Sequence, residues 1–258
     1  MAKSDAGDDS ESIGELVRTV IYALLIALVF RIFFFQPFSI PSSSMKSTLL
    51  IGDYLFVSKY AYGYSRHSIP FSPPLFEGRI WSAEPERGDV IVFKNRRDGN
   101  KDYIKRLMGL PGDTIQVIEG VVNINGTPVT LKRIEDFVEP ISSARISSQL
   151  CSERKVVEGM RVCVKEQYIE TLPNGVEHLV LNTDQNRTNN DNTRKYVVPE
   201  GHYFFMGDNR DNSSDSRKIG SVPFEDLIGR AEIIFLSSEG NPLTFWRWRF
   251  DRFLQWID

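Results

Sequence analysis

The sequence predicts a mainly β protein with a single N-terminal transmembrane helix followed by an antiparallel β-sheet domain. One apolar segment of membrane-spanning length lies near the N-terminus. Most of the remaining chain consists of short runs of β-branched and aromatic residues, and Gly, Pro and Asn separate these runs as they separate strands. With 41% hydrophobic and 25% charged residues, the composition is that of a globular protein and excludes disorder throughout.

Residues 1–15 are acidic and hydrophilic, which predicts a disordered tail. Between 16 and 35 only Arg18, Thr19 and Arg31 are not apolar. At about 1.5 Å per residue, a helix of this length crosses a hydrocarbon core of about 30 Å. The alternative is an export signal that is cleaved off, but the acidic tail and the lack of an A-x-A site favour a retained anchor. We therefore predict a transmembrane helix over 16–35.

Strand-like runs follow the apolar segment. They are rich in Val, Ile, Phe and Tyr and lie at 53–57, 89–93, 103–107, 114–118, 121–124, 203–206 and 231–236. Two turns are expected among them. Asn125-Gly126 is a strong hairpin signal, and the Gly-Leu-Pro-Gly sequence at 109–112 reverses the chain.

The strand pattern weakens over residues 132–199, where we expect an inserted, β-rich but less regular subdomain. The catalytic β domain is then built from 36–131 and 200–240. Cys151 and Cys163 are the only cysteines, and they lack a second pair that would complete a metal site. In an oxidising compartment they could form a disulfide; the sequence is equally compatible with two free thiols.

The C-terminal segment 241–258 is aromatic and basic. As a helix it would group Trp246, Phe250, Phe253, Leu254 and Ile257 on one face. Such an amphipathic segment suits a membrane interface, and packing onto the protein's own sheet is an equal alternative. The formal net charge of -3 offers no broad basic surface, so nucleic acid is excluded as a partner.

Two polar segments and one lysine are candidates for chemistry. A serine-rich segment at 38–49 directly follows the apolar helix, and a loop rich in Asp, Asn and Ser lies at 207–217. Lys105 lies within an apolar strand, where desolvation can lower the pKa of a lysine amine from about 10.4 by several units. Such an amine can deprotonate a serine. The isolated histidines are expected to be structural, and they are His67, His178 and His202.

Four motifs follow one another along the chain: IPSSSM at 40–45, RGDVIVFK at 87–94, YIKRLMGLPGD at 103–113 and GDNRDNSSDSR at 207–217. Their order and the preceding anchor resemble bacterial type I signal peptidases over nearly the whole chain. The resemblance implies a serine endopeptidase with a Ser-Lys dyad, which removes N-terminal signal peptides from exported precursors after small residues. It implies no metal and no cofactor. It also places the catalytic domain on the outer, periplasmic side of the cytoplasmic membrane, and leaves the oligomeric state unknown.

The resemblance also implies a role for each matching residue. Ser44 would be the nucleophile, and Lys105 the general base and then the general acid. Ser42 and the backbone amide of Ser44 would form the oxyanion hole. Ser213 would orient the Lys105 amine. The supporting polar network would consist of Arg106, Asp208, Asp215 and Arg217. The shallow apolar substrate pockets would be lined by Phe38, Ile40, Leu49, Tyr103 and Ile104.

One position departs from the family pattern, which usually has proline two residues after the methionine. This chain has Ser47 there. Proline would stiffen the chain beyond the nucleophile by fixing φ. The sequence therefore leaves the rigidity of this turn unexplained.

Three other functions fit the sequence less well. The S-x-x-K match from Ser43 to Lys46 suggests a penicillin-recognising acyltransferase, but the K-T-G and S-D-N elements of that class are absent. The soluble repressor autopeptidases share Ser-Lys chemistry, yet the anchor and the lack of an N-terminal DNA-binding helix pair disfavour them. A membrane-anchored domain that only binds a partner is disfavoured by the presence of Ser44, Lys105 and Ser213.

Overall fold

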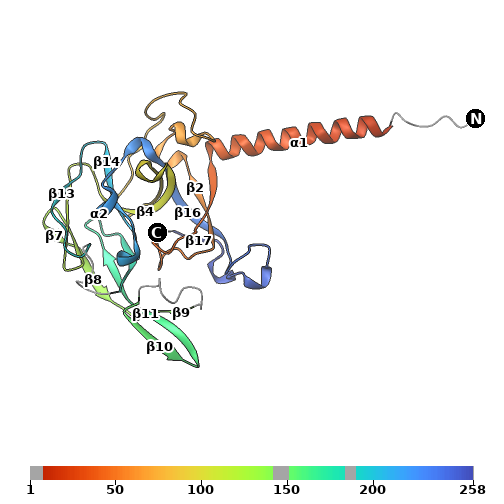
Figure 1. The fold of residues 1–258 in the computed structure, drawn as a ribbon. Coiled ribbons are helices and arrows are strands. Elements are labelled where there is room, and N and C mark those ends of the chain that lie inside the picture. The colour runs from red at the N-terminus through yellow and green to blue at the C-terminus, as the bar shows by residue number, and fades with distance from the viewer. Residues whose placement is uncertain (1–7, 142–150, 184–189, 258) are drawn as a thin grey trace, which may run out of the picture.

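The computed structural model describes residues 8–141, 151–183 and 190–257. Helix α1 (Asp8–Phe33) projects away from the β strands that form the body of the protein (Figure 1). Within residues 13–33 of α1, the most apolar 18-residue stretch has a mean hydropathy of 2.2, and none of that stretch is buried against the protein. This helix is long and apolar enough to cross a membrane.

The bounds of α1 correct two details of the sequence prediction. The helix already begins at Asp8, so the predicted disordered tail is wrong for residues 8–15, while residues 1–7 lie outside the described part. Extending a helix that the apolar segment has nucleated costs little free energy. The helix also ends at Phe33, and Phe35 begins the first strand.

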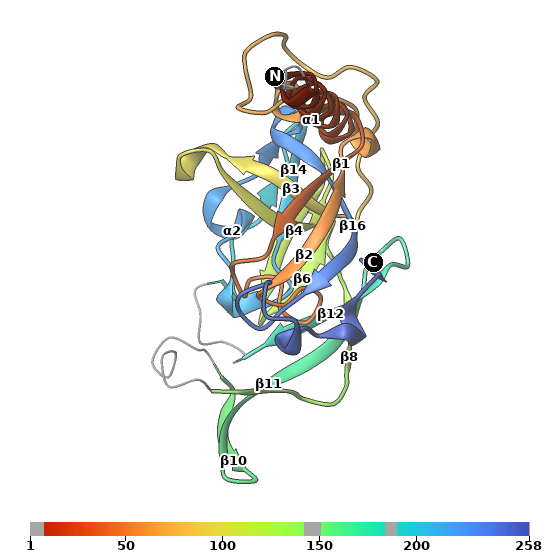
Figure 2. The same cartoon turned by 90° about the vertical axis from the view of Figure 1, so that its right-hand side faces the viewer.

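The main sheet is antiparallel. Its strands are β1 (Phe35–Ser39), β2 (Asp53–Ser58), β3 (Val90–Asn95), β4 (Lys101–Gly109), β14 (His202–Met206), β15 (Val222–Pro223), β16 (Leu227–Ser237) and β17 (Gln255–Trp256). They follow the order β1-β2-β16-β3-β4-β14-β15, with β17 paired to β16. Figure 2 shows β16 beside β2, so the C-terminal part of the chain lies within the sheet that the N-terminal part begins.

Two smaller sheets complete the body. One has the order β13-β5-β6-β7, from β5 (Thr114–Ile118), β6 (Val121–Ile124), β7 (Thr127–Pro128) and β13 (Tyr196–Val197). The other, which we call the β11 ribbon, consists of β8 (Thr130–Arg133), β9 (Phe137–Pro140), β10 (Glu153–Val157), β11 (Met160–Thr171) and β12 (Glu177–Asn182). In the ribbon, all four of the remaining strands pair with β11.

Helical turns connect these strands. They are α2 (Ser216–Ile219) and 3-10 turns at Tyr60–Tyr62, Arg66–Ser68, Arg96–Asp98, Arg210–Asn212, Phe224–Asp226, Phe245–Arg247 and Phe250–Arg252. Six of the seven predicted strand runs lie entirely in strands, and the seventh, 89–93, begins one residue before β3. The Asn125-Gly126 turn joins β6 to β7 with φ values of 55° and 83°, as a hairpin turn of this sequence requires.

The C-terminal segment is not the helix that the amphipathic pattern suggested. It forms two 3-10 turns and the short strand β17, which pairs with Ile233 and Ile234 of β16. Two of its arginines, Arg249 and Arg252, form ion pairs with the buried carboxylate of Asp53 at 3.3 and 2.7 Å. Strand pairing and these ion pairs hold the segment against the sheet, and they outweigh its helical periodicity.

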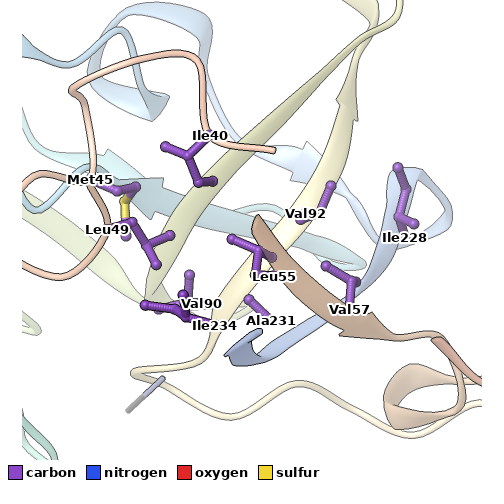
Figure 3. Packing of buried hydrophobic residues seen from close by; sticks show 10 residues of the cluster. All are labelled: Ile40, Met45, Leu49, Leu55, Val57, Val90, Val92, Ile228, Ala231 and Ile234. Carbon is purple, nitrogen blue, oxygen red and sulfur yellow. The ribbon is translucent and has the colours of Figure 1, made fainter. Parts of the chain in front are cut away.

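One cluster of the hydrophobic core includes three residues of the serine-rich segment, Ile40, Met45 and Leu49 (Figure 3). Its members are Ile40, Met45, Leu49, Leu55, Val57, Val90, Val92, Ile228, Ala231 and Ile234. Met45 is only 1% exposed, and burying a side chain of this size contributes about 1.5–3 kcal/mol. The residue after Ser44 is therefore fixed to the core of the main sheet.

The structure joins Cys151 to Cys163 in a disulfide within the β11 ribbon. We expect neither cysteine of the full-length protein, purified without reductant, to react with an alkylating reagent until the disulfide is reduced. Cys163→Ser should lower the free energy of unfolding by about 3 kcal/mol, because the closed loop no longer restricts the unfolded chain. Mass spectrometry of alkylated protein checks the first point and denaturant unfolding checks the second. Two alkylated cysteines before reduction would contradict the pairing.

Candidate active site

An open groove of about 810 Å³ lies between the first half of β4 on one side and β1 with the chain that follows it on the other. The strand register explains why this space is open. β14 pairs with β4 only from Arg106 to Gly109, so Lys101 to Lys105 have no strand partner on that side among the described residues. β1 is likewise an edge strand, and in the described part of the chain it pairs with β2 alone. The groove is thus flanked by two strand edges that can still accept hydrogen bonds from an extended chain.

Ser44 and Lys105 meet in this groove. The distance from Lys105 Nζ to Ser44 Oγ is 2.6 Å, and Nζ also donates to the carbonyl oxygen of Ile104 at 2.8 Å. Lys105 is 4% exposed and Ser44 is 8% exposed. Burial lowers the pKa of the Lys105 amine from 10.5 to about 8, although two nearby carboxylates act in the opposite direction. The pair therefore consists of a hydroxyl and an amine that loses its proton easily.

A second hydroxyl, that of Ser42, lies next to this pair. Ser42 Oγ is 3.4 Å from Ser44 Oγ. Within the described residues, the backbone N–H of Ser44 donates no hydrogen bond. The Ser42 hydroxyl and the Ser44 N–H are therefore two available donors close to the Ser44 oxygen, which is the arrangement that an oxyanion requires.

The polar loop at 207–217 holds the serine segment in place. Asn209 donates from its backbone N–H to the Ser44 carbonyl at 3.0 Å and from its side chain to the Ser43 carbonyl at 2.9 Å. Asn212 donates from its side chain to Ser43 Oγ at 2.7 Å. The sequence analysis missed both asparagines as site residues. Their amides are typical of loops that bond to backbone, but only the fold shows which backbone they hold.

Two buried bidentate arginine–aspartate ion pairs support that loop. Arg106 donates to both oxygens of Asp208, at 3.0 and 2.9 Å, and both side chains are at most 1% exposed. Burial alone would raise the pKa of Asp208, but the charge and hydrogen bonds of Arg106 outweigh it and lower the pKa. Arg217 pairs with Asp215 in the same way at 2.9 and 2.8 Å, and Asp215 also accepts from the Gly207 N–H. The four predicted network residues thus form two buried pairs.

Two predicted site residues are placed differently from the expectation. Ser213 lines the groove, but its buried hydroxyl has no hydrogen-bond partner within the described residues, so the expected bond to Lys105 is not formed. Leu49 is fully buried in the core cluster of Figure 3 and does not line the groove. It supports the site by packing. The remaining predicted pocket residues do line the groove: Phe38, Ile40, Tyr103 and Ile104.

None of the three histidines lines the groove. His67 faces Asp226 at 3.5 Å, and His178 lies 3.2 Å from the buried carboxylate of Glu170. Burial lowers the pKa of His178 and so disfavours its charged form. The ring of His202 lies 3.0 Å from the carbonyl oxygen of Glu200, two residues earlier in the chain. The groove therefore offers Lys105, and no histidine, as a base for Ser44.

The sequence is similar to proteins of known family. A family model described as signal peptidase, peptidase S26, matches residues 13–236. Signal peptidase I of Rickettsia felis is 40% identical over 237 residues, covering 87% of this chain and 79% of that protein. Signal peptidase I of Rickettsia massiliae is 41% identical over 238 residues, covering 88% and 79%. A solved signal peptidase I from Enterococcus faecalis aligns with a TM-score of 0.32 and 24% identity, over 57% of this chain and 97% of that one. The family match includes both Ser44 and Lys105.

The buried pair of Arg106 and Asp208 generates a stability prediction. Asp208→Ala leaves the Arg106 guanidinium buried without its counter-charge, and this should lower the free energy of unfolding by about 3–5 kcal/mol. Asp98→Ala is the matched control, because it removes the carboxylate of the exposed pair with Lys101 and should have little effect. Denaturant unfolding of both variants measures the difference. Equal stability of the two variants would contradict the structural role of Asp208.

Proposed function

The chain belongs to the signal peptidase family, peptidase S26, and we propose that it removes N-terminal signal peptides from exported precursor proteins with Ser44 and Lys105 as its catalytic dyad. Membership of the family makes it a serine peptidase. The observation that carries the proposed dyad is the 2.6 Å contact between the Lys105 amine and the Ser44 hydroxyl. No histidine competes for that hydroxyl in the groove.

The first chemical step starts from the uncharged amine of Lys105. It accepts the proton of the Ser44 hydroxyl while Oγ forms a bond to the carbonyl carbon of the scissile peptide. The carbonyl oxygen gains negative charge as its double bond opens. The Ser42 hydroxyl and the Ser44 N–H donate to that oxygen and lower the barrier.

The second step returns the proton. The Lys105 ammonium gives it to the leaving amine as the carbon–nitrogen bond breaks, and Ser44 is left as an ester of the signal peptide. Lys105, uncharged again, then accepts a proton from the water that attacks this ester. As the bond between the carbonyl carbon and Ser44 Oγ breaks, the Lys105 ammonium returns this proton to Oγ, which restores the Ser44 hydroxyl and releases the signal peptide with a free carboxyl group. Lys105 thus serves as base and then as acid in each of the two half-reactions.

The groove favours an extended substrate with small side chains. The open edges of β1 and β4 can hydrogen-bond to an extended peptide laid between them, which is recognition by strand addition. The walls beside Ser44 carry Phe38, Ile40 and Tyr103. We expect these side chains to leave room only for residues the size of alanine and to exclude larger ones by steric contact.

The protein is anchored in a membrane by α1. We place its catalytic domain on the outer, periplasmic side of the cytoplasmic membrane. The disulfide between Cys151 and Cys163 supports this orientation, because disulfides persist in oxidising compartments and are rare in the cytosol. The same side of the membrane is where a translocated precursor presents its cleavage site.

Removal of either member of the dyad should abolish cleavage while the protein stays folded. We expect Ser44→Ala and Lys105→Met to lower kcat by about 1,000-fold or more. The test is the full-length protein in detergent, acting on a peptide with Ala at the first and third positions before the scissile bond.

Lys59→Met is the matched control for Lys105→Met. Lys59 is also buried, and burial lowers its pKa to about 8 as well, but its amine donates to the Ser68 carbonyl outside the groove. The Lys59 variant, once shown to be folded, should keep its activity, and His202→Ala should do so too. Wild-type activity of folded Lys105→Met would contradict the proposed dyad.

The lowered pKa of Lys105 predicts how activity depends on pH. Above about 8 the amine is mostly uncharged and can accept the Ser44 proton; below it the amine is protonated and cannot. We therefore expect kcat/KM to fall about tenfold per pH unit on the acid side of this pKa. Initial rates between pH 5 and 10 measure the profile. A rate that stays constant down to pH 6 would exclude a lysine base with this pKa.

A further inference from the structure

Lys46, two residues after Ser44, reaches across to the β11 ribbon. Its ammonium forms an ion pair with Glu139 of β9, and the other oxygen of Glu139 lies 3.1 Å from Lys165 Nζ of β11. The side chains of Lys46 and Glu139 are 11% and 14% exposed, and that of Lys165 is 1% exposed. One shielded carboxylate therefore bridges the chain next to Ser44 and the long strand of the ribbon.

Ser47 makes the next contact with the same ribbon. Its hydroxyl donates to the carbonyl oxygen of Leu179 in β12 at 2.9 Å. Its backbone has φ of +94°, a conformation that non-glycine residues rarely adopt. Proline holds φ near about -65°. The proline that the family pattern usually has here is thus incompatible with the backbone of this chain.

We propose that Lys46 and Ser47 are positioning residues, which clamp the chain after Ser44 to the β11 ribbon by side-chain bonds. The clamp does what the fixed φ of a proline does in the family pattern. It acts on the nucleophile through a short path, because the Lys46 N–H donates to the Ser43 carbonyl at 3.1 Å. The inference rests on the proposed function, since it assigns the two residues to the orientation of Ser44.

Variants of Ser47 separate the hydroxyl from the backbone conformation. Ser47→Gly loses the bond to Leu179 but adopts positive φ freely, and Ser47→Pro loses the bond and cannot adopt it. We expect kcat to fall only a few-fold in the first and about 100-fold in the second, since small displacements of reacting groups have effects of this size. KM should change little. Wild-type kcat in folded Ser47→Pro would overturn the proposal.

Variants of the ion pair test the other half of the clamp. Lys46→Gln should lower kcat about tenfold with little change in KM, because it loosens the turn and leaves the substrate walls intact. It also leaves Glu139 paired with Lys165, so the fold is preserved. The double variant Lys46→Gln/Glu139→Gln should lower kcat no more than Glu139→Gln alone, because both substitutions remove the same ion pair. Additive losses, or an unchanged kcat in Lys46→Gln, would contradict the clamp.

Lys155→Gln is the matched control. Lys155 also lies in the β11 ribbon and also pairs with a glutamate, Glu153, but both side chains are about half exposed, at 49% and 58%. This variant should keep wild-type kcat. The acid-side midpoint of the pH profile should be the same in Lys46→Gln as in the wild type, because the clamp moves Ser44 and does not touch the Lys105 amine. A shifted midpoint would show that Lys46 acts on Lys105 instead.

Hydrogen exchange tests the clamp without any cleavage. We expect amide exchange in residues 46–52 of the full-length protein to be faster in Lys46→Gln and Ser47→Ala than in the wild type or in Lys155→Gln. If the wild type cleaves no peptide, the proposed function is wrong. Amide exchange in residues 46–52 still tests the clamp in that case. If exchange is the same in all four proteins, the clamp is overturned whatever the activity.

Discussion

The site depends on one contact: the amine of Lys105 lies within hydrogen-bonding distance of the Ser44 hydroxyl and is kept out of water. Its two hydrogen-bond partners, Ser44 Oγ and the Ile104 carbonyl, are both uncharged. The carboxylates of Asp215 and Asp208 act against the effect of burial, because their negative charge stabilises the ammonium form. Each of them is bound by an arginine. The arginine pairs therefore do more than hold the loop, because they also limit the negative charge that reaches Lys105.

The fold brings this contact about by fixing three separate segments to one sheet. β4 carries Lys105, and it pairs with β3 along one edge while its first half stays open on the other. Met45 fixes the serine segment to the core beneath the groove. Asn209 holds the same segment by donating hydrogen bonds to the Ser43 and Ser44 carbonyls. The nucleophile is thus held by apolar packing on one side and by hydrogen bonds on the other, so it needs no regular secondary structure of its own.

Much of the fold could be predicted from the sequence, because runs such as DVIVF and the Asn125-Gly126 turn encode their structure locally. The C-terminal segment could not, because its structure depends on β16 and on Asp53, which are distant in sequence. Spacing alone did not reveal the contact of Ser44 with Lys105; a resemblance between motifs indicated it. Leu49 was misplaced because an apolar residue near a site can line the groove or support it from below. The ion pair of Lys46 with Glu139 joins residues whose partnership no local pattern encodes.

The central claim is that burial lowers the pKa of the Lys105 amine far enough for the amine to be uncharged at mildly alkaline pH. Its most direct test is an NMR titration of the full-length protein with labelled lysine side chains, in which the Lys105 signal is identified by its loss in Lys105→Met. The structure predicts a midpoint of about 8 for this amine, well below the ordinary value of 10.5. A midpoint near 10.5 in the folded protein would show that Lys105 is charged when Ser44 must be deprotonated, and would contradict the account.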